Sequence, residues 1–170
     1  NYAKLYVNEE YQGVYVNVER IDESFLDRHF PESAGGLWKN DVGGPGGDLT
    51  YLGEDAAQYK KSFEAKNKAA KNRLELIGFI KRINQTPDAN LLEMLESNMD
   101  LEALFKVMSV MLFSGAFDQL TGWGPHNFYL FHDTKQNRWH YLPWDLDVGF
   151  CETAFGHVYV IDDWNAAWPL

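Results

Sequence analysis

The chain has 170 residues, of which 45% are hydrophobic and 15% aromatic. This length and composition indicate one globular domain with a real core and exclude a disordered chain. The formal net charge of −10 at pH 7 disfavours nucleic acid or an anionic membrane as a partner. The single cysteine excludes an internal disulfide framework, and no apolar run reaches the length of a membrane helix. Because the chain opens at Asn1 on a strand-like pattern without an initiator methionine, we expect a fragment of a longer protein.

Alternating apolar residues predict a β-hairpin at the start of the chain. Residues 2–7 and 13–21 have the pattern of strands, and residues 8–12 join them as a turn. A glycine-rich turn between two strands can cover the phosphates of a bound nucleotide. Here the turn contains Glu9 and Glu10, which would repel phosphate. We therefore expect a solvated hairpin and not a phosphate clamp.

Short ordered pieces and a glycine-rich loop follow the hairpin. Asp22 can cap a short helix that ends before Pro31, and residues 37–39 predict a strand. Residues 43–47 read Gly-Gly-Pro-Gly-Gly, which is similar to a phosphate cradle at first sight. No Lys-Ser/Thr pair and no helix start follow them, so this segment is not a P-loop. We expect a mobile loop or lid here.

Helical patterns dominate the middle of the chain. Propensity alone predicts one helix over residues 55–83. Thr86 as N-cap and Pro87 as first residue predict the start of a helix over residues 88–96. The next predicted helix, over residues 101–116, is apolar nearly all round, and we expect it to be central and buried.

The stretch from Asp118 to Phe150 contains a predicted β-hairpin. Residues 128–131 and 139–144 are aromatic, strand-like runs. Residues 133–137 between them have the composition of a turn. Folding the hairpin back brings the two outer ends of its strands together.

Polar side chains gather at this open end of the hairpin. His126 and Asn127 precede the first strand, Asp145 and Asp147 follow the second, and Asp118 can face the same space. Phosphoryl transfer needs a carboxylate for the hydroxyl nucleophile and hard oxygen ligands for Mg²⁺. Protein kinases supply them in the order base Asp, Asn, short hairpin and metal Asp, and Asp118, Asn127 and Asp145 follow that order. The Asp-to-Asn spacing is longer than in the usual kinase loop, which indicates an atypical kinase.

Simpler explanations of these residues stay open at this point. Asp and Asn at strand ends are most often caps and turn formers. The histidines could indicate a zinc site, but the chain has no His-x₃-His spacing and no cysteine pair. We instead expect His126 to orient Asp118 or Asn127 by a hydrogen bond.

Several short segments, in one order along the chain, carry a family resemblance. They are Leu5-Tyr6-Val7-Asn8, Gly13-Val14-Tyr15 with Glu19, Leu37-Trp38-Lys39, Tyr59 with Phe63-Glu64-Ala65-Lys66, His126-Asn127-Phe128-Tyr129-Leu130 and Pro143-Trp144-Asp145-Leu146-Asp147. In these segments the chain resembles the CotH (spore coat protein H) kinase family. The resemblance spans nearly the whole chain, so it is more specific than any single motif.

The resemblance implies a protein-kinase-like α+β fold with a small antiparallel sheet, a helical part and a catalytic β-hairpin, truncated at its end. We expect a single CotH-like kinase domain over residues 1–170, with a nucleotide-binding sheet part over about 1–85 and a helical, catalytic part over 86–170. A kinase would place its activation segment beyond Phe150. The family pattern also favours a strand near residues 62–66, paired with the strand of Lys39, in place of one long helix.

The resemblance further implies roles for individual residues. The expected catalytic base and metal ligands are Asp118, Asn127, Asp145 and Asp147, the last as a further ligand or loop anchor. The expected nucleotide-site residues are Lys39, Glu64, Lys66 and His126. Lys39 is the first choice for neutralising phosphate oxygens, because a strand holds its ammonium group rigidly. Glu64 could be its ion-pair partner, and Lys66 is the alternative phosphate ligand.

The sequence therefore predicts an atypical protein kinase that transfers the ATP γ-phosphate to Ser or Thr of secreted, coat or cell-surface proteins. We expect ATP with Mg²⁺ or Mn²⁺ between the sheet and the helical part, and an extracellular, cell-surface or spore-coat location. The expected partners are ATP and a Ser/Thr-containing protein, without nucleic acid or membrane insertion. Two alternatives remain: a non-catalytic surface or adhesion module of the same fold, and a metal-dependent phosphoester hydrolase.

Overall fold

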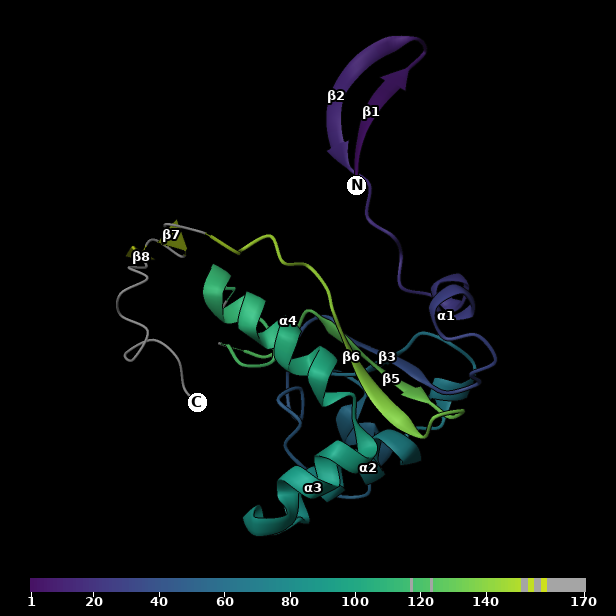
Figure 1. Ribbon diagram of the computed structural model, residues 1–170, viewed down its shortest axis with the longest axis vertical. Helices are drawn as coiled ribbons and strands as arrows, with labels where there is room; N and C mark the ends of the chain where they lie inside the picture. The colour runs from purple at the N-terminus through teal and green to yellow at the C-terminus, as the bar shows by residue number, and fades with distance from the viewer. Residues whose placement is uncertain (117, 123, 151–152, 155–156, 159–170) are drawn as a thin grey trace. The chain divides into compact units, whose positions relative to one another are not determined.

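The structure, a computed structural model, describes residues 1–116, 118–122 and 124–150 and the backbone of 153–154 and 157–158. This part of the chain is α+β, with four α-helices and small antiparallel sheets (Figure 1). It divides into two compact units, Asn1–Glu32 and Ser33–Leu170. None of the described helices has the length and apolarity needed to cross a membrane. Apart from the short strands β7 (Thr153–Ala154) and β8 (His157–Val158), the predicted activation segment lies outside the described residues.

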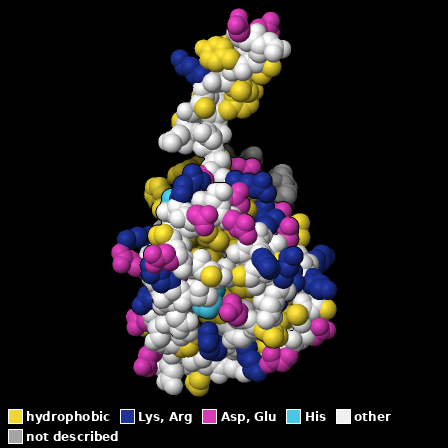
Figure 2. Space-filling model, turned by 90° about the vertical axis from the view of Figure 1, so that its right-hand side faces the viewer, with side chains coloured by type: hydrophobic (Ala, Val, Ile, Leu, Met, Phe, Trp, Pro, Cys, Tyr) yellow, Lys and Arg dark blue, Asp and Glu magenta, His cyan; other side chains and the backbone are white. Residues whose placement is uncertain are grey.

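The first unit opens with an antiparallel hairpin of β1 (Tyr2–Val7) and β2 (Glu10–Val16). The predicted turn over residues 8–12 is wrong, because only Asn8 and Glu9 form it. Their φ angles of 49° and 70° are those of a two-residue hairpin turn, so pairing resumes at once. Apolar side chains line the exposed hairpin, as Figure 2 shows.

Helix α1 (Glu23–His29) completes the first unit. As predicted, the side chain of Asp22 caps it by accepting hydrogen bonds from the backbone N–H groups of Ser24 and Phe25. The helix ends at His29 with Phe30 as its C-cap, in agreement with a stop before Pro31.

The second unit is built around a four-stranded antiparallel sheet with the strand order β4-β3-β5-β6. The strands are β3 (Leu37–Asn40), β4 (Glu64–Ala65), β5 (Phe128–Asp133) and β6 (Arg138–Pro143). The predicted strand near residues 62–66 is confirmed, and it pairs with β3 so that Lys39 lies opposite Glu64. The sheet therefore combines strands from both of the parts expected from the sequence, residues 1–85 and 86–170.

Three helices accompany this sheet. They are α2 (Leu74–Gln85), α3 (Asp88–Asn98) and α4 (Leu101–Ser114), preceded by short 3-10 helices at Ala56–Tyr59 and Ala69–Lys71. The single helix predicted over residues 55–83 is wrong. The predicted N-cap role of Thr86 is also wrong: its N–H donates to the carbonyl of Arg82 and so closes α2, and α3 starts after Pro87 without a side-chain cap.

Stacked aromatic rings form the centre of the core. Phe79 of α2 lies parallel to Trp139 of β6, with ring centroids 4.5 Å apart, and Trp38 of β3 stacks on Trp139 at 5.6 Å. All three side chains are buried. The indole N–H of Trp38 donates to the carbonyl of Ala70 at 2.9 Å, so its one polar group is satisfied.

Helix α4 is only partly buried, contrary to the prediction from its apolar sequence. Leu104 and Met111 are buried in the core, whereas Phe105 and Phe113 are 53% and 69% exposed. The described part of the chain covers only the core-facing side of α4, which packs against β6.

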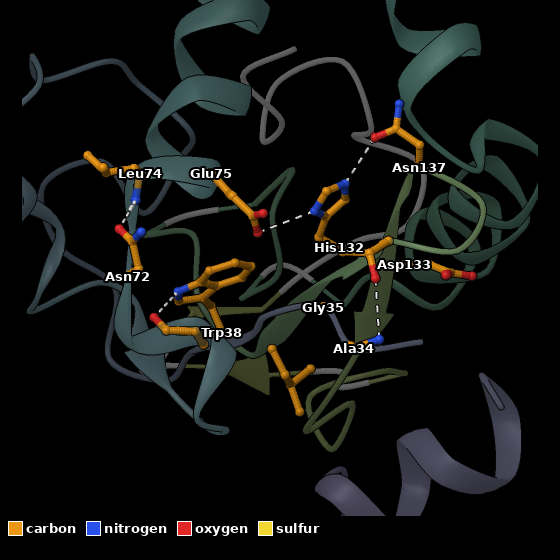
Figure 3. Close-up of polar contacts among 12 residues, drawn as sticks. Ala34, Gly35, Trp38, Asn72, Leu74, Glu75, His132, Asp133 and Asn137 are labelled. Carbon is orange, nitrogen blue, oxygen red and sulfur yellow. Dashed lines mark hydrogen bonds and ion pairs between the residues drawn. The ribbon is translucent and has the colours of Figure 1, made fainter. Parts of the chain in front are cut away.

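The closed end of the β5–β6 hairpin is fixed by His132 and Gly35 (Figure 3). His132 lies between Glu75 and Asn137, with nitrogen-to-oxygen distances of 3.4 Å to each, and its ring stacks on Trp139. Gly35 passes so close that an added Cβ would lie 1.5 Å from the carbonyl oxygen of His132. Only glycine fits at this position.

Two Gly→Ala substitutions should therefore act in opposite directions. Gly35→Ala should lower the melting temperature strongly, because the backbone must move away from His132. Gly78→Ala, in the middle of α2, places its Cβ in open space and should raise stability by about 1 kcal/mol through helix propensity. Thermal unfolding followed by circular dichroism checks both, and equal effects of the two variants would contradict the packing at Gly35.

Candidate active site

Helix α4 leads into the loop that contains Asp118. The helix ends at Ser114, and its C-cap Gly115 has a φ of 69°, in the left-handed region that glycine adopts without strain. The N–H groups of Gly115 and Ala116 donate to the carbonyls of Leu112 and Met111. This cap stops the helix and redirects the chain toward Asp118.

Asp118 and Asn127 make the central polar contact of the site. Nδ2 of Asn127 donates a hydrogen bond of 2.8 Å to Oδ2 of Asp118. Asn127 is buried, and the Asp118 side chain is 15% exposed. Oδ1 of Asp118 is buried and has no hydrogen-bond partner in the described part of the chain. The expected proximity of these two side chains is thus a direct contact, and one carboxylate oxygen is left for another group.

His126 lies beside this pair without a hydrogen bond to it. Its Nδ1 is 2.6 Å from the carbonyl oxygen of Gly124, and because a carbonyl only accepts, Nδ1 carries the hydrogen. Its Nε2 is 3.9 Å from Oδ2 of Asp118, which is too long for a hydrogen bond. The predicted hydrogen bond from His126 to Asp118 or Asn127 is therefore wrong, and a protonated His126 would act on Asp118 through charge.

Burial raises the pKa of Asp118 above the ordinary value for aspartate, because the carboxylate loses hydration. A positive charge on His126 and the hydrogen bond from Asn127 lower the pKa, whereas the negative charge of Asp147 raises it. Asp147 is thus within electrostatic range of Asp118. A carboxylate with a raised pKa is suited to accept a proton near neutral pH.

The open end of the β5–β6 hairpin holds Asn127 opposite Trp144. The N–H of Trp144 donates to the carbonyl of Asn127 at 3.0 Å, so the ladder extends one pair beyond the strands. Asn127 and Asp145 have φ angles of 61° and 54°, a left-handed conformation that Asn and Asp tolerate better than most residues. Asp145 and Asp147 are exposed beyond this point. Their convergence with Asn127 on one ion stays a prediction.

Gln119 is a buried residue that sequence reasoning missed. Its Nε2 donates to the carbonyl of Trp144 at 2.9 Å, and its Oε1 accepts from the hydroxyl of Tyr141 at 3.2 Å. The sequence offers no signal for this role beyond the position next to Asp118, because the partners lie more than twenty residues away.

The glycine-rich segment 43–47 is a packed turn and not the predicted lid. Ser62 donates from its hydroxyl to a carbonyl of this segment at 2.5 Å. The buried side chain of Asn40 donates to the carbonyls of Gly47 and Pro125, at 2.9 and 3.2 Å. A Cβ at Gly47 would lie 3.1 Å from the carbonyl oxygen of Pro125. The glycines thus allow this turn to rest against the loop that contains Asp118.

Lys39 is held at the same end of the sheet. Its side chain is 13% exposed, and its ammonium group pairs with Asp41 at 2.5 Å. The ammonium also lies 5.7 Å from the ring centroid of Tyr129 and 5.5 Å from that of Trp144. Since Trp144 directly precedes Asp145, the structure brings Lys39 close to the segment predicted to hold metal.

The predicted ion pair between Lys39 and Glu64 is wrong. Glu64 pairs with Lys66 at 2.5 Å, whereas Lys39 pairs with Asp41. Asp41 lies two residues from Lys39, and alternate residues of a strand share a face. That spacing was a usable signal in the sequence. Lys66 remains at the outer strand β4, next to its acidic partner.

The predicted metal ligands have chemistry that fits a divalent cation. Asn127, Asp145 and Asp147 offer one amide and two carboxylate groups, the hard oxygen donors that Mg²⁺ and Mn²⁺ prefer. Asn127 uses its Nδ2 toward Asp118, which leaves its amide oxygen out of that contact. Within the described ranges, no group of three or more His, Cys, Asp or Glu side chains is arranged to hold a metal ion. Mg²⁺ commonly takes only one or two protein carboxylates together with substrate phosphates.

Asp118→Asn should stabilise the protein at pH 7, because it removes a carboxylate whose ionisation is penalised by burial. A raised folded-state pKa means that the parent loses stability as pH rises from the unfolded value of about 4 through the folded value. The stability gain of the variant should therefore be small below pH about 4 and grow with pH. Melting temperatures across this range check it, with the exposed Glu93→Gln as control; a gain that grows toward low pH would contradict the burial argument.

Comparison with known protein families gives a match over most of the chain. The family described as "CotH kinase protein" matches residues 1–157 of the 170-residue chain, which includes every residue of the site described above. A comparison with curated proteins gave no match. The matched range covers most of the chain and the whole of the β5–β6 hairpin. The chain belongs to the CotH kinase family.

Proposed function

We propose that this chain is an atypical protein kinase, which transfers the γ-phosphate of ATP to Ser or Thr of secreted, coat or cell-surface proteins. The observation that carries the proposal is the contact of Asp118 with Asn127 at the open end of the β5–β6 hairpin, where Asp145 follows. Family membership supports a kinase-like activity. The residues of the contact supply the groups that phosphoryl transfer needs, in the order that kinases use.

Asp118 is the proposed catalytic base. Its Oδ2 is held by Asn127, and its Oδ1 is buried without a partner in the described part of the chain. In the proposed reaction, the carboxylate of Asp118 orients the acceptor hydroxyl and takes its proton as the new oxygen–phosphorus bond forms. ADP leaves with the electrons of the broken bond. The raised pKa of Asp118 favours uptake of this proton.

Lys39 and the acidic segment after β6 are the proposed nucleotide site. Asn127 and Asp145 would hold Mg²⁺ or Mn²⁺, with Asp147 as a further ligand, and the bound ion would neutralise phosphate charge. Lys39 would move its ammonium from Asp41 to the phosphate oxygens, over the rings of Tyr129 and Trp144 that already support it. Preorganised charge of this kind is the main source of rate in phosphoryl transfer.

Transfer from γ-labelled ATP to casein, or to the chain itself, tests the proposed function. Asp118→Asn and Asp145→Asn should each reduce transfer about 10²-fold or more while remaining folded, and Glu93→Gln should equal the parent. Both Asp variants as active as the parent would contradict the site. Free phosphate without labelled protein would favour the hydrolase alternative, and absence of nucleotide binding with or without Mg²⁺ would favour the non-catalytic module.

Two lysine substitutions decide which ammonium contacts phosphate. Lys39→Met should raise KM for ATP about tenfold, which corresponds to about 1.4 kcal/mol, because it removes the cation beside Trp144. Lys66→Met should change KM less than about twofold, since Lys66 is engaged by Glu64 on the outer strand. Steady-state kinetics at varied ATP measure both, and a larger effect of Lys66→Met would reverse the assignment.

A further inference from the structure

The side chain of Gln119 is fixed in one orientation inside the protein. Gln119 is fully buried. Its Nε2 donates to the carbonyl of Trp144 at 2.9 Å and reaches that of Asp145 at 3.4 Å. Its Oε1 accepts from the hydroxyl of Tyr141 at 3.2 Å. A flipped amide would set its oxygen against two carbonyl oxygens, so only one orientation satisfies all these groups.

Tyr141 supports this orientation because it remains a donor. Burial raises the pKa of Tyr141 far above its usual value, and the negative charge of Asp118 raises it as well. The hydroxyl therefore stays protonated at neutral pH and can donate to Gln119. Tyr141 and Gln119 are thus joined by a hydrogen bond, and Tyr141 lies within electrostatic range of Asp118.

Gln119 acts on both sides of the proposed site. On one side it is covalently next to Asp118. On the other side it holds the carbonyl of Trp144, whose N–H is already held by the carbonyl of Asn127. The peptide groups flanking Trp144 are therefore fixed, and Asp145 follows in a left-handed conformation that surrounding contacts must maintain.

We propose that Gln119 is a positioning residue that sets the separation between Asp118 and Asp145. The inference rests on the proposed kinase function. Without the amide, the Trp144–Asp145 segment can shift relative to Asp118, so that the base and the metal ligand no longer face the same phosphoryl group. Displacement of a reacting group by about 1 Å can reduce the rate of an enzyme about 10²-fold.

Gln119→Met tests this role, because methionine keeps the length of the side chain and cannot make the hydrogen bonds. We expect kcat for transfer from ATP to fall at least about tenfold and KM for the acceptor to stay within about twofold. We also expect Mn²⁺ to bind more weakly in the presence of ATP, by about fivefold, as measured from the electron paramagnetic resonance signal of free Mn²⁺. Ile77→Val, a core substitution, is the control for general destabilisation.

The outcomes separate the inference from the proposed function. If the parent transfers phosphate and Gln119→Met matches Ile77→Val in kcat and Mn²⁺ affinity, the inference is overturned and the kinase function stands. If the parent neither transfers phosphate nor binds Mn²⁺ with ATP, the proposed function fails, and the inference fails with it. Should Gln119→Met not fold, Gln119→Glu is judged by the same measurements, since it keeps the acceptor for Tyr141 and loses the donor to Trp144.

Discussion

The site depends on the two hydrogen bonds of Asn127. Its side chain donates to Asp118, and its backbone carbonyl accepts from the N–H of Trp144. One residue thereby joins the loop after α4 to the end of the β5–β6 hairpin. Asn is suited to this position because it tolerates a positive φ and carries a donor on a short side chain. Replacement by a residue without an amide would break the link on the side of Asp118.

Placing a carboxylate in this link has an electrostatic consequence. Asp118 loses hydration by burial, and the nearby charge of Asp147 adds to the penalty on its ionised form. A positive charge on His126 acts in the opposite direction and lowers the pKa of Asp118. Lys39 lies near the same end of the hairpin, but its ammonium group already forms an ion pair with Asp41. A divalent cation bound beside Asp118 and Asp147 would offset their negative charge, which agrees with a kinase-like family.

Sequence patterns predicted the elements whose local signals are strong. The β5–β6 hairpin, the α1 cap at Asp22 and the pairing of β3 with β4 follow from alternation, capping and family pattern. From the sequence we expect Asp118 to face the same space as Asn127, and the structure places the two side chains in direct contact. Sequence patterns failed where contacts distant in sequence determine the structure. The glycine-rich segment 43–47, expected to be a mobile loop or lid, is held by Asn40 and Ser62. The helix expected to be buried, α4, has an exposed outer side. Gln119 has no local signature, because its partners are distant in sequence.

We propose that Asp118, Asn127 and Asp145 serve a single bound metal ion and its triphosphate. A crystal structure with Mn²⁺ and a non-hydrolysable ATP analogue, with the ion located by anomalous scattering, measures this directly. We predict that oxygens of Asn127 and Asp145 lie about 2.0–2.2 Å from the same ion, with a carboxylate oxygen of Asp118 facing the γ-phosphate. An ion bound elsewhere, or Asn127 and Asp145 too far apart to share it, would contradict this shared metal site.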